Sequence, residues 1–202
     1  MKINRGAEIL LAPASFHKIE KLYAAMQEEY DRLAGTLGFS CLGCPDNCCD
    51  SFFLHHTYAE WAYLRAGFSN LPAASRDRVT ARAWEYVRRA EAALGMGERP
   101  RIMCPLNEEG LCVLYTHRML ICRLHGLPAK MIQPDGRALH FPGCFRCQEL
   151  TGDTDPLALD RTDFLRRMAG IELELRKALP GLLPKTKLTL AQMIVKGPPR
   201  CP

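Results

Sequence analysis

Long apolar runs are absent from this chain of 202 residues. No stretch of about 18 consecutive apolar residues occurs, so we expect no transmembrane helix and no membrane partner. The opening segment carries Lys2 and Arg5, but Glu8 and Pro13 interrupt the apolar stretch that a signal peptide needs. We therefore expect a cytoplasmic protein, in a reducing compartment where thiols persist.

The common catalytic motifs are absent as well. The sequence contains no P-loop, no glycine-rich dinucleotide fingerprint, no G-x-S-x-G elbow and no H-E-x-x-H helix. Its aromatic residues do not alternate with basic residues as they do in proteins that bind single-stranded nucleic acid. The sequence therefore leaves enzymatic activity undecided, favours a non-enzymatic role and argues against a nucleic-acid partner. It identifies no protein partner.

Cysteine, in contrast, is abundant. The chain has ten cysteines, and nine of them fall between residues 41 and 147. In a reducing compartment, clustered cysteines are more typical of metal sites than of disulfides. We expect the tenth, Cys201, to be a free thiol in a frayed tail. The predicted metal ligands are Cys41, Cys44, Cys48, Cys49, Cys104, Cys112, Cys122, Cys144 and Cys147.

The spacing of these cysteines supports the same interpretation. C-x2-C pairs occur at Cys41 and Cys44 and again at Cys144 and Cys147. Two sulfurs at this spacing can bind one ion about 2.3 Å away while the backbone turns over it. Cys48 and Cys49 are adjacent, and in extended backbone their side chains diverge. We therefore expect one of them to join Cys41 and Cys44 and the other to face a second site or the core.

The region from residue 104 to residue 123 reads CPLNEEGLCVLYTHRMLICR. Together with the first cysteine knot, it resembles the CxxCxxCC family of zinc- or iron-chelating proteins, whose members combine a double-cysteine knot with C-P, G-x-C-x-x-Y, R-P and C-R motifs. Two departures stand out: three residues precede Cys48 where many relatives have two, and Met119 replaces the usual proline. A similar cysteine arrangement occurs in flagellin lysine methylases, as a remote likeness, because this chain lacks most of their length.

Simpler metal motifs do not fit. A zinc ribbon needs its two C-x2-C pairs about 15 to 20 residues apart, but 99 residues separate Cys44 from Cys144. The ferredoxin spacing fails at Cys48. We predict a metal-binding protein that holds zinc, or alternatively iron or a [4Fe–4S] cluster, in a structural or chelation and delivery role. The alternatives are an iron–sulfur redox or methyl-transfer enzyme and a zinc-stabilised interaction or nucleic-acid-binding module.

Several other residues allow both a functional and a plain interpretation. The pair His55 and His56, as well as His117 and His125, could complete or support a metal site, although packing or surface roles are favoured. Tyr115 and Arg118 could shield the sulfurs, or serve as a core residue and a salt-bridge partner. We expect both tryptophans, Trp61 and Trp84, in the core. The arginines between residues 76 and 89 are interpreted as a solvated helix face.

The apolar periodicity predicts a mainly α fold: one helical domain over residues 1–202, wrapped around an irregular cysteine-rich metal-binding core with a small β-ribbon. The core spans 41–147, between helical segments 1–40 and 148–202. Helices are expected over 15–33, over 57–65 with a stop at Gly67, from a cap at Ser69 or Asn70 to Gly95, over 162–179 and over 188–195. Strands are expected over 129–132 and 137–141, joined by the turn at 134–136.

Overall fold

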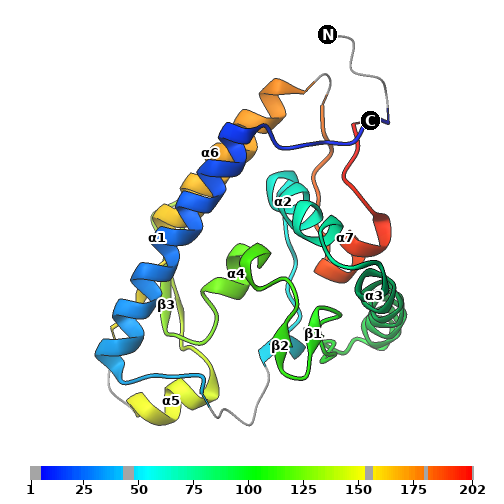
Figure 1. Ribbon diagram of the computed structural model, residues 1–202. Coiled ribbons are helices and arrows are strands. Elements are labelled where there is room, and N and C mark those ends of the chain that lie inside the picture. Colours follow the sequence, from blue (N-terminus) through cyan, green and yellow to red (C-terminus); the bar gives the residue numbers. More distant parts are fainter. Residues whose placement is uncertain (1–5, 43–47, 153–156, 180–181, 202) are drawn as a thin grey trace. The chain divides into compact units, whose positions relative to one another are not determined.

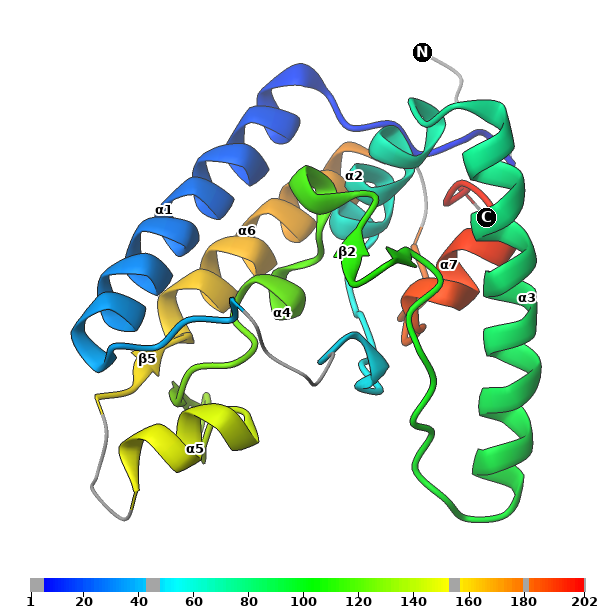
Figure 2. The same cartoon turned by 60° about the horizontal axis from the view of Figure 1, so that its bottom comes forward.

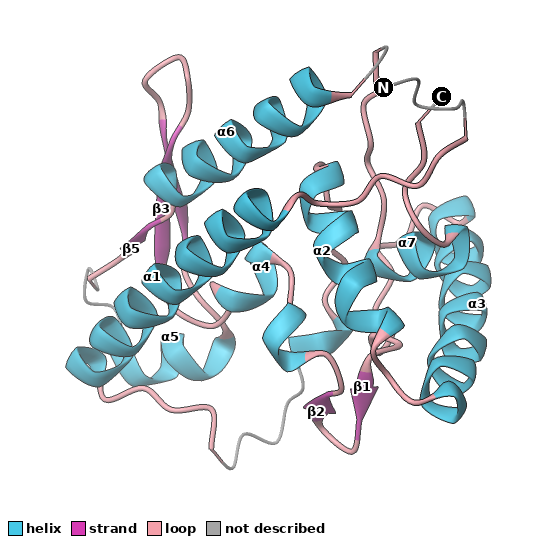
Figure 3. Ribbon diagram, turned by 45° about the horizontal axis from the view of Figure 1, so that its top comes forward, coloured by secondary structure: helices cyan, strands magenta, loops and turns pink. Residues whose placement is uncertain are grey.

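The computed structural model describes residues 6–42, 48–152, 157–179 and 182–201. Helices dominate these residues, at 54% of the structure, and the strands are short (Figure 3). The prediction of a mainly helical chain with a small β-ribbon is therefore confirmed. The α-helices are α1 (Pro13–Leu37), α2 (Tyr58–Ser69), α3 (Ala73–Gly95), α4 (Leu120–Arg123), α5 (Phe145–Thr151), α6 (Thr162–Ala178) and α7 (Leu190–Lys196).

The short elements form two small sheets. Strands β1 and β2 make an antiparallel hairpin, while β3 pairs antiparallel with β4 and parallel with β5. The predicted pair of strands is confirmed, but β5 was not predicted from its two residues. The bounds are β1 (Asn107–Glu108), β2 (Leu111–Cys112), β3 (Ala129–Ile132), β4 (Ala138–Phe141) and β5 (Leu159–Asp160), with 3-10 helices η1 (Cys48–Asp50) and η2 (Tyr115–His117).

The chain divides into two compact units. Unit 1 comprises Met1–Phe16, Cys49–Met119 and Glu172–Pro202, and unit 2 comprises His17–Cys48 and Leu120–Ile171. The expectation of a single domain stays a prediction beside this division. The boundary falls between the adjacent cysteines Cys48 and Cys49, of which one was expected to join Cys41 and Cys44 and the other to face a second site or the core.

Unit 1 is held together by groups that are distant in sequence. The buried Trp61 indole on α2 donates hydrogen bonds to the carbonyls of Met193, at 3.2 Å, and Gly197, at 2.9 Å. The carboxylate of Glu172 accepts from the Ala59 N–H at 2.9 Å. Helices α3 and α7 pack side by side (Figure 1). These pairings offset the free energy of taking the Trp61 indole and the Glu172 carboxylate out of water.

In unit 2, α1 buries the predicted apolar stripe, including Ile19, Leu22 and Met26. Its Tyr30 hydroxyl donates to the carbonyl of His125 at 3.1 Å, and the Arg123 guanidinium lies 4.0 Å from the Tyr23 ring centroid. These contacts attach α1 to the segment that follows α4. Figure 2 shows this unit's helix α5 beside the chain that leaves α1.

The expected end of the second helix at Gly67 is wrong. Helix α2 continues to Ser69, and Gly67 is buried within it against the imidazole of His117; an added Cβ would lie 2.3 Å from the ring. Glycine is therefore present because the ring occupies the side-chain space. The expected cap of α3 is also wrong: Asn70 ends α2, and Pro72 precedes α3 without a side-chain hydrogen bond.

Two further expectations need correction. Trp84 is 59% exposed on α3 rather than buried. The tail is not frayed up to residue 201: the N–H of Cys201 donates to the Ala7 carbonyl at 2.9 Å, and the N–H of Ile9 donates to the Pro199 carbonyl at 2.7 Å. Cys201 is therefore buried, because backbone pairing supplies an attachment that side-chain periodicity does not reveal.

Among the described residues, no helix combines the length and apolarity needed to cross a membrane.

Candidate metal centre

Two of the predicted ligands lie together at the start of α5 in unit 2. Cys144 caps this helix and is half-buried, and Cys147 is fully buried. Residues three apart on a helix share a face, so the two sulfurs belong to the same side of α5. The C-x2-C spacing thus places two thiols on one short element, as a shared ion requires.

The backbone before Cys144 needs glycine. Gly143 has φ +87°, and an added Cβ would lie 2.7 Å from the carbonyl oxygen of Gly126. The next residue, Cys144, donates its N–H to that same oxygen at 2.8 Å. The close approach fixes the start of α5 against the segment that follows Cys122, so Cys122 and Cys144 are linked through four residues of backbone and one hydrogen bond.

A third thiol, Cys41, comes from a segment about a hundred residues earlier in the chain. The Arg146 guanidinium donates to the carbonyl of Leu42 at 3.1 Å, which holds the residue after Cys41 against α5. Figure 1 shows the chain beyond α1 running to this helix. Burial raises the pKa of the Cys147 thiol, and the neighbouring Cys144 and Cys41 sulfurs raise it further because a third negative charge beside them is unfavourable. Cys41, Cys144 and Cys147 are therefore electrostatic neighbours.

Unit 1 connects a second set of three cysteines, which lie in η1, in a loop and in β2. The N–H of Cys104 donates to the carbonyl of Cys49 at 2.9 Å, and the Cys104 carbonyl accepts from Asn107 at 3.0 Å. Asn107 in turn pairs with Cys112 across the β1–β2 hairpin. Cys104 also lies near Tyr86, whose pKa is raised to about 12 by burial and, to a lesser extent, by the Cys104 sulfur. The backbones of Cys49, Cys104 and Cys112 are thus connected.

The predicted ligands do not form a complete site within the described part of the chain. No three histidine, cysteine or acidic side chains there surround a position where one metal ion could bind. Cys44 and the side chain of Cys48 lie outside the described residues. No disulfide joins two of the described cysteines. The structure therefore brings together Cys41, Cys144 and Cys147 as neighbours, and Cys49, Cys104 and Cys112 through their backbones.

The histidines of interest have other surroundings. His55 is buried, its backbone pairs with Leu188, and burial lowers its pKa. His117 packs its ring 4.7 Å from the Tyr63 centroid, within the aromatic group that also contains Phe16. His125 contributes its carbonyl to Tyr30. These contacts agree with packing roles, the interpretation that the sequence favoured.

Tyr115 and Arg118, on the family-like motif, contact each other. The Arg118 guanidinium lies 3.7 Å from the centroid of the Tyr115 ring, a cation–π contact. Because Tyr115 is 57% exposed, its expected alternative role as a core residue is wrong. The motif positions therefore form a surface pair.

The arginines of α3 are engaged with nearby groups. Arg82 donates to the Pro105 carbonyl at 2.9 Å and to the Glu108 carboxylate at 2.9 Å, and Arg78 lies 3.5 Å from the same carboxylate. Arg88 pairs with Glu85 at 2.6 Å. These pairs agree with the interpretation of a solvated helix face.

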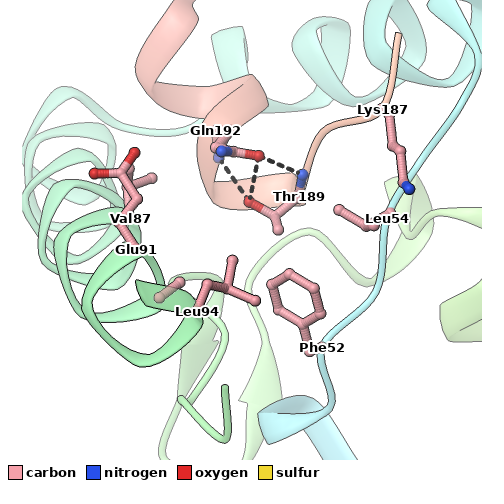
Figure 4. A pocket seen from close by; sticks show the side chains of 9 residues that line it. Phe52, Leu54, Val87, Glu91, Leu94, Lys187, Thr189 and Gln192 are labelled. Atoms are coloured by element: carbon pink, nitrogen blue, oxygen red, sulfur yellow. Dashed lines mark hydrogen bonds between the residues drawn. The ribbon is translucent and has the colours of Figure 1, made fainter. Parts of the chain in front are cut away.

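An apolar cavity of about 240 Å³ lies in unit 1 between α3, α7 and the segment before α2 (Figure 4). Phe52, Leu54 and Leu94 line it, with Glu91 and Lys187 among its charged residues. Two of its polar lining residues, Thr189 and Gln192, already hydrogen-bond each other as the capping box of α7. No cysteine lines this cavity, and no motif in the sequence predicts it.

Comparisons with protein-family models, curated proteins and solved structures found no match to this chain.

Proposed function

We propose that this protein binds a metal ion, zinc or alternatively iron, through cysteine thiolates of unit 2, in a structural or chelation and delivery role. The observation that carries the proposal is the hydrogen bond from Arg146 to the Leu42 carbonyl, which holds the segment of Cys41 against the helix that begins at Cys144. The Cys144 and Cys41 sulfurs also help to raise the pKa of Cys147. Bringing together thiols from segments about a hundred residues apart stabilises the fold little unless a shared ligand binds them.

The chemistry of the donors fits a soft metal. Thiolates favour zinc, copper(I) and iron–sulfur clusters over hard cations such as magnesium. Cys122 is the remaining described thiol of unit 2, and we assign it as the fourth ligand because its segment carries the Gly126 carbonyl that holds Cys144. Metal would draw these four side chains together, because binding and folding are coupled in such sites.

The thiols of unit 1 support a second, separate site by the same chemistry. Cys49, Cys104 and Cys112 contribute three potential sulfur donors, joined through backbone hydrogen bonds. The resemblance to metal-chelating proteins covers these residues as well. This second assignment is weaker because the three sulfurs come from three different short segments: Cys49 from η1, Cys104 from a loop and Cys112 from β2.

Elemental analysis of protein purified without oxygen tests the proposal. We expect a colourless protein that contains between about one and two zinc ions per chain. A brown protein with visible iron–sulfur absorption would instead favour the redox or methyl-transfer enzyme. Freshly purified protein that contains neither metal, and that does not bind added Zn²⁺ or Fe²⁺, would overturn the proposal.

Single substitutions then locate the ligands. Cys144→Ser and Cys122→Ser should each lose the metal of unit 2, since three thiolates hold zinc much more weakly than four. Cys201→Ala is the matched control: Cys201 is buried but belongs to neither group of sulfurs. If Cys122→Ser kept all its zinc and its melting temperature, the assignment of Cys122 would be wrong.

A further inference from the structure

One wall of the cavity in unit 1 is a single face of α3. Val87, Ala90, Glu91 and Leu94 line it at offsets of three, four and seven residues, the spacing at which residues of a helix share a face. Ala90 is buried, whereas Leu94 is 52% exposed, so the cavity opens to solvent beside Leu94. Apart from the Glu91 carboxylate, this wall is apolar.

The second wall is held in place by backbone hydrogen bonds. The N–H of His55 donates to the Leu188 carbonyl at 2.7 Å, and the N–H of Leu188 donates to the His55 carbonyl at 3.1 Å. In an antiparallel pair of this kind the flanking residues also lie opposite each other, which places Leu54 across from Thr189. Both of these residues line the cavity. The second wall is therefore fixed by the fold before any ligand binds.

The size and lining of the cavity suit a small molecule. Its volume of about 240 Å³ exceeds that of an apolar cavity of about 150 Å³ that can hold one benzene molecule. A single aromatic ring or a short branched chain that carries one polar group therefore fits. Small-molecule sites are mostly apolar, and a few polar groups in them fix the orientation of the ligand.

The polar groups of the second wall are donors. The Lys187 side chain extends toward Leu54 (Figure 4), and within the described residues no ion pair involves it. The Gln192 side-chain oxygen accepts from the Thr189 N–H at 2.9 Å, which leaves the amide N–H groups of Gln192 to donate. An ammonium and an amide donor together suit a carboxylate. Glu91, on the opposite wall, repels an anion, so an anionic group is directed toward Lys187.

We propose that this cavity binds a small apolar carboxylate. The apolar body of the ligand lies between α3 and Leu54, and its carboxylate accepts from Lys187 and Gln192. The proposal is independent of the metal site, because no cysteine lines the cavity. The opposite polarity, an apolar amine held by Glu91, is distinguished by the test.

The test compares three probes of nearly the same shape: phenylacetate, its neutral analogue phenylacetamide, and the cation phenethylamine. Their dissociation constants for the full chain, purified without oxygen, are measured by NMR titration. We expect phenylacetate to bind with a dissociation constant on the order of 1 mM, about 3- to 10-fold more tightly than phenylacetamide, and phenethylamine to bind most weakly. The proposal is overturned if phenethylamine binds most tightly, or if phenylacetate does not bind at about 20 mM.

Two variants then locate the bound probe. Lys187→Gln should remove the preference for phenylacetate over phenylacetamide, and a preference that persisted would overturn the role of Lys187. Lys185→Gln is the matched control, since Lys185 is exposed in the same segment but does not line the cavity. Val87→Phe fills the cavity and should abolish binding of phenylacetate; unchanged binding would place the probe elsewhere and overturn the proposal. Because Lys187 is exposed, its variant gives a result even if Val87→Phe does not fold.

Discussion

The two units solve the problem of stability in different ways. Unit 1 joins distant segments by hydrogen bonds between buried groups, such as those from Trp61 to the carbonyls of Met193 and Gly197. Unit 2 contains the neighbouring thiols Cys41, Cys144 and Cys147. The difference teaches that unit 1 is joined chiefly by polar contacts between its own distant segments, although it also keeps buried donors such as Asn107 Nδ2 without a partner, whereas the thiols of unit 2 are the groups that the proposed ion would bind. On the proposed function, we expect a chelator to destabilise unit 2 most, and unit 1 only to the extent that its weaker second site holds metal.

Alanine substitutions at the two tryptophans test whether the contacts of Trp61 hold unit 1 together. Trp61→Ala should lower the free energy of unfolding by about 3 to 5 kcal/mol, because it opens a cavity and leaves two buried carbonyls without a donor. Trp84→Ala should change it by less than about 0.5 kcal/mol, since that ring is largely exposed. Urea unfolding followed by circular dichroism measures both, and equal losses would contradict the assignment of Trp61 as the central contact.

Alanine substitutions at one glycine of each unit compare how tightly the two units are packed. Gly67→Ala in unit 1 should cost about 1 to 3 kcal/mol, since the new methyl group meets the His117 ring. Gly170→Ala in α6 meets nothing within 4 Å and should stabilise unit 2 by about 0.5 to 1 kcal/mol through better helix propensity. Thermal melting of both variants measures the effect. A neutral Gly67→Ala would show that the ring moves aside at little cost.

The capping box of α7 should contribute less to the free energy of unfolding than the contacts of Trp61 and Gly67. Thr189→Ala removes the side-chain oxygen that accepts the Gln192 N–H at 3.2 Å, and it should cost about 1 kcal/mol. Thr189→Ser keeps the acceptor and serves as the control. Chemical denaturation distinguishes the two, and a loss of similar size in Thr189→Ser would point to the missing methyl group rather than the cap.

The pH dependence of unit 1 should carry a small contribution from His55. Burial lowers its pKa, with Glu60 opposing and His56 adding to the shift. The folded state thus binds fewer protons than the unfolded state, so this contribution is complete above about pH 6.5 and is lost as the pH falls below it. Unfolding free energies measured between about pH 7.5 and 5.5 should fall less steeply in His55→Gln than in wild type, with His56→Gln as the control.

Periodicity predicted most of the fold. The stripe of α1, from Ile19 to Leu33, and the strand Ala129–Ile132 follow directly from spacing. The misses share a physical cause: Gly67, Trp84 and Cys201 owe their environments to partners distant in sequence. Local propensity cannot detect a ring that occupies the place of a side chain, or a tail that pairs with residues 6–9.

The sequence predicted that cysteines would be the candidate ligands, but it did not predict which cysteines lie close together. C-x2-C spacing at Cys144 and Cys147 predicts a shared face, and α5 provides it. Nothing local links Cys41 to that helix; the link is the hydrogen bond from Arg146 to Leu42.

The indole of Trp61 bonds to carbonyls more than 130 residues further along the chain. During synthesis those acceptors leave the ribosome long after α2 has formed. The Trp61 ring therefore stays exposed until more than 130 further residues have been synthesised, an interval in which chaperones can recognise it.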